Sequence, residues 1–304
     1  MDLKTSALSR LEGQLRACFF SDSTLADFSD DAYFWSGQNI RGKICLDLGK
    51  AYGLSEDTLL DIAASTQLLH DASLIHDDLI DEDTERRGCL AIWKKYGKAK
   101  ALLIGDLLIS KAYEIVIQSK VSAATKVVWT SEISAAVSSA VSGAVAELEF
   151  DTHNQQLILE NYYRMASRKT GALFALPARC IALTADQLVD VDRLNTIFLN
   201  LAVAYQIKDD QSDFLGTKSG RQHSSDLENG RPNLYHILTS NGMSTEKCFD
   251  YINDYQESLV ADSIQLADSL PKQVCVILKE LLIPFIELEP LPSSNGLGLL
   301  QVGT

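Results

Sequence analysis

Two copies of one acidic pattern, Asp-Asp-x-x-Asp, constrain the fold of this chain more than any other feature. The six carboxylates fall into two groups, first Asp77, Asp78 and Asp81, and much later Asp209, Asp210 and Asp213. Residues i and i+4 lie one turn apart on the same face of an α-helix. Each copy therefore gathers carboxylates along one helix face, which is costly unless a cation neutralises the charge. The fold has to present both groups to cations.

Carboxylate oxygens are hard ligands that suit Mg²⁺ or Mn²⁺, and Mg²⁺ commonly completes its coordination with substrate phosphates. All six aspartates are therefore candidate metal ligands. A single Asp-rich helix end is often only a solvated acidic face, whereas two copies, each after an apolar helical run, favour a metal site. Arg86-Arg87-Gly88 follows the first copy within a few residues, and cations there suit an anionic substrate. The pattern predicts a metal-dependent diphosphate site.

On these motifs the chain resembles the trans-isoprenyl diphosphate synthases, which form the polyprenyl synthetase family, over about residues 37–235. Gly105-Asp106-Leu107-Leu108 is a further mark of that family. The resemblance implies an all-α fold, a single-domain bundle of ten or more helices around a central cavity (the isoprenoid synthase fold), and a homodimer. We expect residues 1–288 to form this domain and residues 289–304, which contain prolines and glycines, to form a loose tail.

The resemblance also implies roles for individual residues. The aspartates would hold up to three Mg²⁺ ions, Lys169 would grip the allylic diphosphate, and Thr170 and Gln206 would lie near the nascent cation. The catalytic set then comprises Asp77, Asp78, Asp81, Asp209 and Asp210 together with Arg86, Lys169, Thr170 and Gln206, and Asp213 is a metal ligand alone. The candidates for substrate binding are Arg41, His70, Arg86, Arg87, Lys169, Lys218 and Arg231, with Ala72 and Ser73 beside the growing chain. A lone histidine in an apolar run is often just a core residue, so both interpretations of His70 stay open.

Two segments depart from the family pattern: the lesser is Cys89-Leu90-Ala91, where the family has Pro and Thr or Ser, and the main one precedes the first motif. Where the family carries Gly-Lys-Arg-x-Arg-Pro, this chain has Gly-Gln-Asn-Ile-Arg-Gly, so two cations and a proline are replaced by Gln38, Asn39 and Gly42. These changes favour a class I terpene cyclase, which needs no isopentenyl diphosphate. The retained Arg41, His70 and Arg87 favour a synthase instead. A third alternative is a non-catalytic partner subunit, but two complete aspartate motifs argue against it. The preferred prediction is Mg²⁺-dependent condensation of an allylic diphosphate with isopentenyl diphosphate.

The residues before the first motif bear on product length. A chain growing from Asp77 would extend along its helix towards the N-terminus, so side chains upstream form the floor. The fourth and fifth preceding residues, Ser73 and Ala72, are small, and the next bulky candidates are Leu69 and Leu68. In the family, a Tyr or Phe at the fifth place commonly stops growth at fifteen carbons. One isoprene unit adds about 4–5 Å, close to the roughly 5.4 Å of a helical turn. We therefore predict a product of twenty carbons or slightly more, and a shorter one in Ala72→Phe.

Composition and charge narrow the partners and the compartment. The net charge of −14, with no basic face to offset it, argues against nucleic acid as a partner. Six scattered cysteines without Cys-x-x-Cys spacing indicate reduced thiols. The first residues lack the apolar core of a signal peptide, and no apolar run is long enough to span a membrane. We expect a cytoplasmic protein with no integral membrane segment.

Periodicity and capping signals predict two long helices in the first half of the chain. Ser55 is a suitable N-cap for a helix that continues through Asp81. Residues 123–150 are almost uniformly small or apolar, which is typical of a helix that is buried all round, so we expect it at the centre of the fold. Glu147, near the end of this segment, receives no role.

In the second half, Gly171 interrupts a helical pattern beside Lys169 and indicates a kink, since glycine costs about 1 kcal/mol against alanine in a helix. Residues 187–210 are predicted to form the helix that carries the second motif. Residues 216–230, rich in glycine, serine and charge, are predicted to form a loop.

Overall fold

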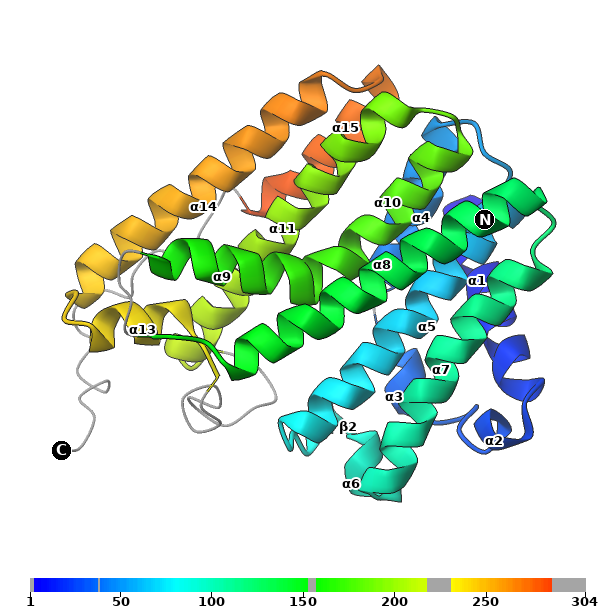
Figure 1. The fold of residues 1–304 in the computed structure, drawn as a ribbon, viewed down its shortest axis with the longest axis horizontal. Coiled ribbons are helices and arrows are strands. Elements are labelled where there is room, and N and C mark those ends of the chain that lie inside the picture. The colour runs from blue at the N-terminus through cyan, green and yellow to red at the C-terminus, as the bar shows by residue number, and fades with distance from the viewer. Residues whose placement is uncertain (1–2, 38, 153–156, 218–230, 286–304) are drawn as a thin grey trace.

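The computed structural model describes residues 3–37, 39–152, 157–217 and 231–285 of the 304-residue chain. These segments form more than ten α-helices and one two-stranded hairpin (Figure 1). The helices of the first half are α1 (Leu3–Phe20), α2 (Ser23–Ala26), α3 (Ala32–Trp35), α4 (Ile40–Ala51), α5 (Glu56–Ile80), α6 (Ile92–Tyr96), α7 (Lys98–Gln118) and α8 (Ala123–Leu148). Those of the second half are α9 (Ile158–Ala166), α10 (Ala172–Thr184), α11 (Leu188–Phe214), α13 (Leu234–Ser240), α14 (Thr245–Asp268) and α15 (Lys272–Leu282), followed by the 3₁₀ turn η3 (Ile283–Phe285). The predicted all-α bundle is confirmed.

Helix α5 is the centre of the first half, where it packs against α1, α4, α7 and α10. It begins as predicted, because the Ser55 side chain accepts a hydrogen bond from the Thr58 N–H at 3.3 Å. Every residue from Ile62 to Ala72 is buried. Since this stretch covers about three helical turns, α5 is enclosed on all sides.

Four of the polar side chains inside this buried stretch, those of Ser65, Thr66, Gln67 and Asp71, make hydrogen bonds within α5 itself. The hydroxyls of Ser65 and Thr66 each donate to the carbonyl four residues earlier, at 2.9 Å. The Gln67 amide donates to Asp71 Oδ1 at 2.8 Å. Buried polar groups cost little once they are hydrogen-bonded, so the polar residues of α5 are compatible with its central position.

Helix α8 differs from the sequence prediction. Only Trp129, Ile133, Ala136 and Gly143 of α8 are buried, and α8 lies at the front of the bundle, beside α7, in Figure 1. Its outer face exposes large apolar side chains, namely Val127, Val128, Val141, Val145 and Leu148. The prediction of a buried central helix was therefore wrong for the single chain, because apolar composition does not say which surface will cover a helix.

In the second half, α11 packs against α10, α13 and α14. One cluster of buried apolar side chains extends from α1 through α5 to α10 and α11, and a smaller one lies between α9, α11, α13 and α14. Between α9 and α10, Ser167–Gly171 form a π-helical turn, η2, at the place where Gly171 indicated a kink. Helix α11 extends past the predicted end at residue 210, to Phe214. The proposed domain end at residue 288 and the tail 289–304 lie outside the described residues and stay predictions.

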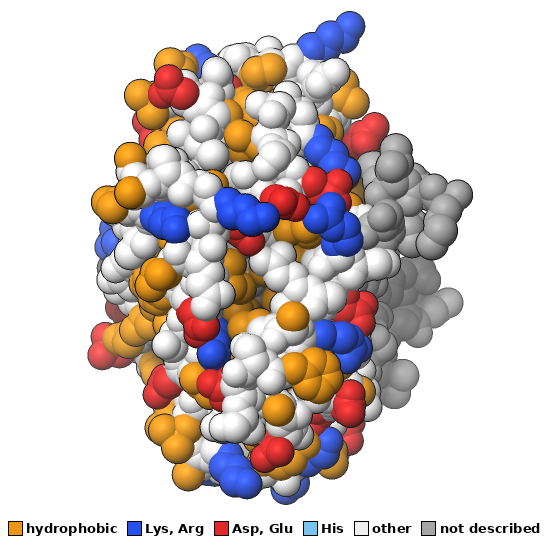
Figure 2. Space-filling view, turned by 90° about the vertical axis from the view of Figure 1, so that its right-hand side faces the viewer, with side chains coloured by type: hydrophobic (Ala, Val, Ile, Leu, Met, Phe, Trp, Pro, Cys, Tyr) orange, Lys and Arg blue, Asp and Glu red, His pale blue; other side chains and the backbone are white. Residues whose placement is uncertain are grey.

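The surface in Figure 2 carries cationic and anionic side chains side by side, with hydrophobic side chains between them. The described residues visible in this view form no continuous basic area of the kind that a nucleic-acid backbone requires.

Candidate active site

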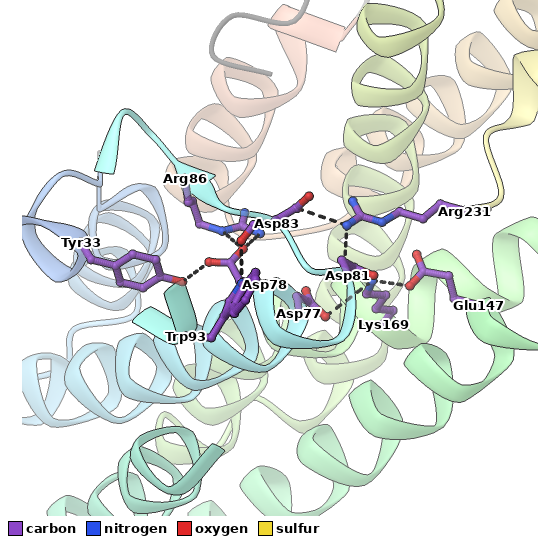
Figure 3. Close-up of polar contacts among 10 residues, drawn as sticks. All are labelled: Tyr33, Asp77, Asp78, Asp81, Asp83, Arg86, Trp93, Glu147, Lys169 and Arg231. Atoms are coloured by element: carbon purple, nitrogen blue, oxygen red, sulfur yellow. Dashed lines mark hydrogen bonds and ion pairs between the residues drawn. The ribbon is translucent and has the colours of Figure 1, made fainter. Parts of the chain in front are cut away.

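The first acidic motif lies at the C-terminal end of α5 (Figure 3). Asp81 caps the helix, and its N–H donates to the Asp77 carbonyl at 2.8 Å. Asp77 Oδ1 lies 3.6 Å from Lys169 Nζ. One guanidinium nitrogen of Arg231 lies 2.8 Å from Asp81 Oδ2 and 3.1 Å from Asp83 Oδ2. Burial raises the pKa of Asp81 to about 6, against the opposing charges of Arg231 and Lys169. Two cations from distant segments thus balance these carboxylates.

Asp78 has a different environment from its two neighbours in the motif. It is fully buried, and the Tyr33 hydroxyl donates to its Oδ2 at 2.7 Å. Arg86 donates to Asp78 Oδ1 through Nε at 2.6 Å, and its Nη2 lies 2.5 Å from the same oxygen. Burial raises the pKa of Asp78, while Arg86 opposes that rise. Consecutive helical residues point about 100° apart, so Asp78 faces protein donors, on another side of α5 from Asp77 (Figure 3).

A short hairpin after α5 positions the two arginines of the Arg-Arg-Gly sequence. Its strands are β1 (Glu85–Arg86) and β2 (Cys89–Leu90). Arg87 and Gly88 form the turn and have positive φ values of 52° and 76°, as in type I′ hairpin turns. A Cβ on Gly37 would lie 2.7 Å from Arg87 Nη1. The hairpin therefore directs Arg86 to Asp78 and lays Arg87 against the backbone of Gly37.

Lys169 joins three elements, because it lies in η2 and contacts both Asp77 of α5 and Glu147 of α8 (Figure 3). Burial lowers the pKa of Lys169, but the two carboxylates raise it above its ordinary value, so the ammonium stays charged. Gly143 permits this approach, since a Cβ there would lie 2.2 Å from the Lys169 backbone nitrogen. Sequence reasoning missed Glu147, because no motif marks it and only the crossing of α8 over η2 brings it to Lys169.

The second acidic motif lies in the last turns of α11. Asp210 is buried, and it accepts hydrogen bonds from the Tyr162 hydroxyl and the Leu234 N–H, both at 2.8 Å, and from Gln206 Nε2 at 3.1 Å. The other two carboxylates of this motif also make polar or electrostatic contacts: half-buried Asp209 and buried Asp213. Asp210, like Asp78, is therefore held by protein donors.

Contacts at the start of α13 connect the two motifs. Asn233 Nδ2 donates to the Asp210 carbonyl at 2.9 Å, and two residues earlier Arg231 contacts Asp81. Helices α5 and α11 both end towards the lower left of Figure 1. The fold thus brings together two aspartate groups that lie more than a hundred residues apart in the sequence.

A second group of charged residues gathers where α4, α5 and the hairpin turn meet; we call Arg41, His70, Asp71 and Arg87 the Arg41 cluster. The Arg41 guanidinium lies 4.0 Å from the centre of the Phe174 ring, and burial lowers the pKa of Arg41 to about 10. Burial and the nearby arginines hold the pKa of His70 well below its ordinary value, so the imidazole is neutral. Burial raises the pKa of Asp71 to about 7. The structure therefore brings three of the predicted substrate-binding residues into one electrostatic environment.

Within the described segments, no three Asp, Glu, His or Cys side chains converge closely enough to form a metal centre by themselves. Asp77 and Asp81 nevertheless fit a divalent cation, because both offer carboxylate oxygens at the same end of α5. Lys169 and Arg231, which contact them, are cations that a phosphorylated substrate could take over. Two carboxylates completed by substrate phosphates are a common ligand set for Mg²⁺. The donor set therefore fits Mg²⁺ in the company of a phosphorylated substrate.

Known proteins resemble this chain in sequence and in fold. The polyprenyl synthetase family profile matches residues 22–265. A farnesyl diphosphate synthase of Bacillus subtilis is 31% identical, over 68% of this chain and 72% of its own length. This chain belongs to the polyprenyl synthetase family.

Solved structures agree with the family fold. A geranylgeranyl pyrophosphate synthetase from Pyrococcus horikoshii superposes with a TM-score of 0.83 at 23% identity, over 94% of this chain and 97% of that one. A polyprenyl synthase from Caulobacter crescentus, solved with calcium and isoprenyl diphosphate, gives a TM-score of 0.78 at 20% identity, over 93% and 95% of the two chains. The predicted isoprenoid synthase fold is confirmed.

As a member of the polyprenyl synthetase family, the chain is a trans-prenyltransferase that elongates prenyl diphosphates. The cyclase alternative is not favoured, because the related proteins are chain-elongating synthases. None of the helices in the described part of the chain is long and apolar enough to cross a bilayer.

Three of the remaining candidate residues lie in the described segments. Ala72 is buried, whereas Ser73 is half-buried and its hydroxyl donates to the His70 carbonyl at 2.7 Å. Thr170 lies in η2, directly after Lys169. Gln38 and Lys218 lie outside the described residues. The individual roles given to these residues stay predictions.

Proposed function

We propose that this protein condenses an allylic diphosphate with isopentenyl diphosphate, with Mg²⁺ as the cofactor. The observation that carries this proposal is the meeting of Asp77 and Asp81 with Lys169 and Arg231 at the end of α5. Carboxylates for a metal and cations for a diphosphate then lie side by side. The Arg41 cluster, where α4, α5 and the hairpin turn meet, supplies separate cations for a second phosphorylated substrate.

The proposed Mg²⁺ ligands are Asp77, Asp81, Asp209 and Asp213. Mg²⁺, when bound, would act as a Lewis acid that stabilises the departing diphosphate. The sequence also put forward Asp78 and Asp210 as ligands, but both are buried against protein donors. We assign these two residues to fixing the ends of α5 and α11, so that their neighbours point into the site.

The first substrate would be held by groups that the carboxylates already position. Lys169 and Arg231 can donate charge-assisted hydrogen bonds to the allylic diphosphate, and they stabilise the charge that develops as it leaves. Thr170 and Gln206 would stabilise the carbocation through the negative ends of their side-chain dipoles. The site also has to exclude water from that cation.

The second substrate would bind at the Arg41 cluster. Arg41 and Arg87 supply two positive charges, and neutral His70 can donate one hydrogen bond to a phosphate oxygen. Asn39 stands where the family has an arginine, so this site has fewer cations than the family pattern. We expect weaker binding of isopentenyl diphosphate as a result, with the chemistry unchanged.

Purified protein should extend an allylic primer with labelled isopentenyl diphosphate, and EDTA should abolish this activity. Asp77→Ala and Asp209→Ala should lower turnover by several orders of magnitude while circular dichroism stays unchanged. Asp254→Ala, at an exposed position of α14, is the matched control and should keep full activity. Normal turnover in either motif variant would defeat the proposed ligand roles. Hydrocarbon or alcohol products from farnesyl diphosphate alone would instead support the cyclase alternative.

We also propose a homodimer that covers α7 and α8. Between residues 127 and 146 of α8 the only charged side chain is Glu132, and the outer face of that helix exposes several valines. Helix α7 exposes Leu102, Leu103 and Ile117. Apolar surface of this extent commonly marks an interface. Light scattering should give twice the chain mass, and Val141→Glu should reduce it to one chain mass. A wild-type monomer would refute the proposal.

A cytoplasmic location is the proposal that best suits the thiols. All six cysteines are free, and three of them are buried. Reduced thiols are typical of the cytosol.

A further inference from the structure

A small cavity lies inside the bundle, at the end away from the acidic motifs. It lies between α5, α7, α8 and α10 and has a volume of about 10 Å³, barely enough for one water molecule. The residues of the three helices that matter here are Ile62 and Thr66 of α5, Ile133 and Trp129 of α8, and Leu176 and Cys180 of α10. Trp129 is the largest of them and is only 1% exposed.

The same three helices also meet at the active site, and we infer that a hydrocarbon chain would run between them, along a column that they wall. At the active-site end of the column, Lys169, just before α10, contacts Asp77 of α5 and Glu147 of α8. At the cavity end lie Thr66, eleven residues before Asp77, and Cys180, eleven residues after Lys169. Eleven residues make about three full turns, so Thr66 lies on the same face of α5 as Asp77. The column is therefore about 16–17 Å long.

The cavity end of the column is suited to a hydrocarbon. The hydroxyls of Ser65 and Thr66 donate to carbonyls of α5 at 2.9 Å, so they present carbon atoms to the cavity. The indole Nε1 of Trp129 donates to Thr184 Oγ1 at 2.8 Å, and this hydroxyl in turn donates to the Cys180 carbonyl at 2.6 Å. These two hydrogen bonds fix the ring to α10 and leave its donor satisfied.

We propose that Trp129 is the floor that sets product length. The proposal rests on the proposed elongation of an allylic diphosphate from Asp77 along α5. Four isoprene units, each about 4–5 Å for four carbon–carbon bonds, span about 16–20 Å and match the column. A chain of twenty carbons would reach the indole, and a longer one would have to displace it. This floor lies deeper than Leu69 and Leu68, the bulky residues nearest to Ala72 in the sequence.

The test is the product distribution of Trp129 variants with a farnesyl diphosphate primer and excess isopentenyl diphosphate, read by mass spectrometry after dephosphorylation. Wild type should accumulate the twenty-carbon product. In Trp129→Leu the main product should lengthen by at least one isoprene unit. Trp129→Phe removes less volume and should give a several-fold rise in the share of longer products. Phe249→Leu, a buried substitution in the other apolar cluster, is the control and should leave product length unchanged.

Two results would overturn the proposal. One is a folded, active Trp129→Leu with the wild-type distribution. If Trp129→Leu does not fold, an unchanged distribution in folded Trp129→Phe has the same force. A wild-type protein that forms no elongated product would refute the proposed function itself, which is a separate outcome.

Discussion

The substitution Gly143→Ala tests whether the contact between α8 and the π-helical turn η2 positions the active site. A Cβ on Gly143 would lie 2.2 Å from the Lys169 nitrogen and 2.7 Å from its Cα. Both are backbone atoms, which cannot rotate away as a side chain can. Ordinary contacts of a Cβ lie at 3.4–4 Å, so α8 and η2 must separate by about 1 Å to reach van der Waals distance.

That separation has a cost in stability and in activity. Overpacking of a tight contact typically costs about 1–3 kcal/mol, which exceeds or offsets the roughly 1 kcal/mol that alanine gains over glycine in a helix. We expect a net loss of up to about 2 kcal/mol in the free energy of unfolding. Activity should fall more steeply, because a displacement of about 1 Å in a catalytic group can cost about 100-fold, and Lys169 moves with η2.

The assay compares two glycine substitutions in α-helices. Gly13 of α1 is exposed, and no other atom lies within 4 Å of the place that a Cβ would take there, so Gly13→Ala should raise the free energy of unfolding by up to about 1 kcal/mol and leave turnover unchanged. Denaturant unfolding gives the stabilities, and turnover is measured on the same preparations. If Gly143→Ala gains stability as Gly13→Ala does, and keeps full turnover, the positioning argument is wrong.

Three further predictions concern α5. Asp71 has a folded-state pKa of about 7, above the unfolded value of about 3.9. The folded state therefore binds more protons between these two values, so the free energy of unfolding falls as pH rises from about 4 to about 7. Asp71→Asn removes this term, so denaturant unfolding should show the variant gaining about 2 kcal/mol on wild type between about pH 5.5 and about pH 8; equal pH profiles would contradict it. Asp78→Asn leaves the half-buried Arg86 without its counter-charge and should lose up to about 3 kcal/mol of stability. Asp77→Asn should instead lose mainly turnover. Thermal unfolding and turnover of both variants decide this. Ser73→Phe places a ring one turn from Asp77 at a half-buried position and should shorten the product by at least one isoprene unit, which mass spectrometry would detect.

Local sequence signals located the elements that carry the chemistry. The Ser55 cap, the two acidic motifs and the irregularity at Gly171 are all found where the sequence predicted them. Each of these signals acts through neighbours within about one helical turn, such as a capping hydrogen bond or a Cβ that is missing. Such effects can be derived from a single sequence.

Packing between distant segments could not be derived in that way. The apolar segment 123–150 was expected at the centre of the fold, yet α5 occupies that place with Ser65, Thr66, Gln67 and His70 buried in it. Helix α5 can be buried because Ser65, Thr66 and Gln67 make their hydrogen bonds within that helix. The exposed face of α8 would be buried only if another part of the chain or a second chain packed on it. The amino-acid composition of a segment predicts neither its hydrogen-bond partners nor the surface that packs on it.

The sequence by itself thus determined the all-α class and the acidic ends of two helices, because helix periodicity and charge are local properties. Only the tertiary structure decided which aspartates face the site, since Asp78 is held by Tyr33 and Arg86 while Asp77 faces Lys169. It also brought Glu147 to the lysine and Trp129 to the end of the column. These contacts join residues far apart in the chain, so their geometry depends on how the helices cross.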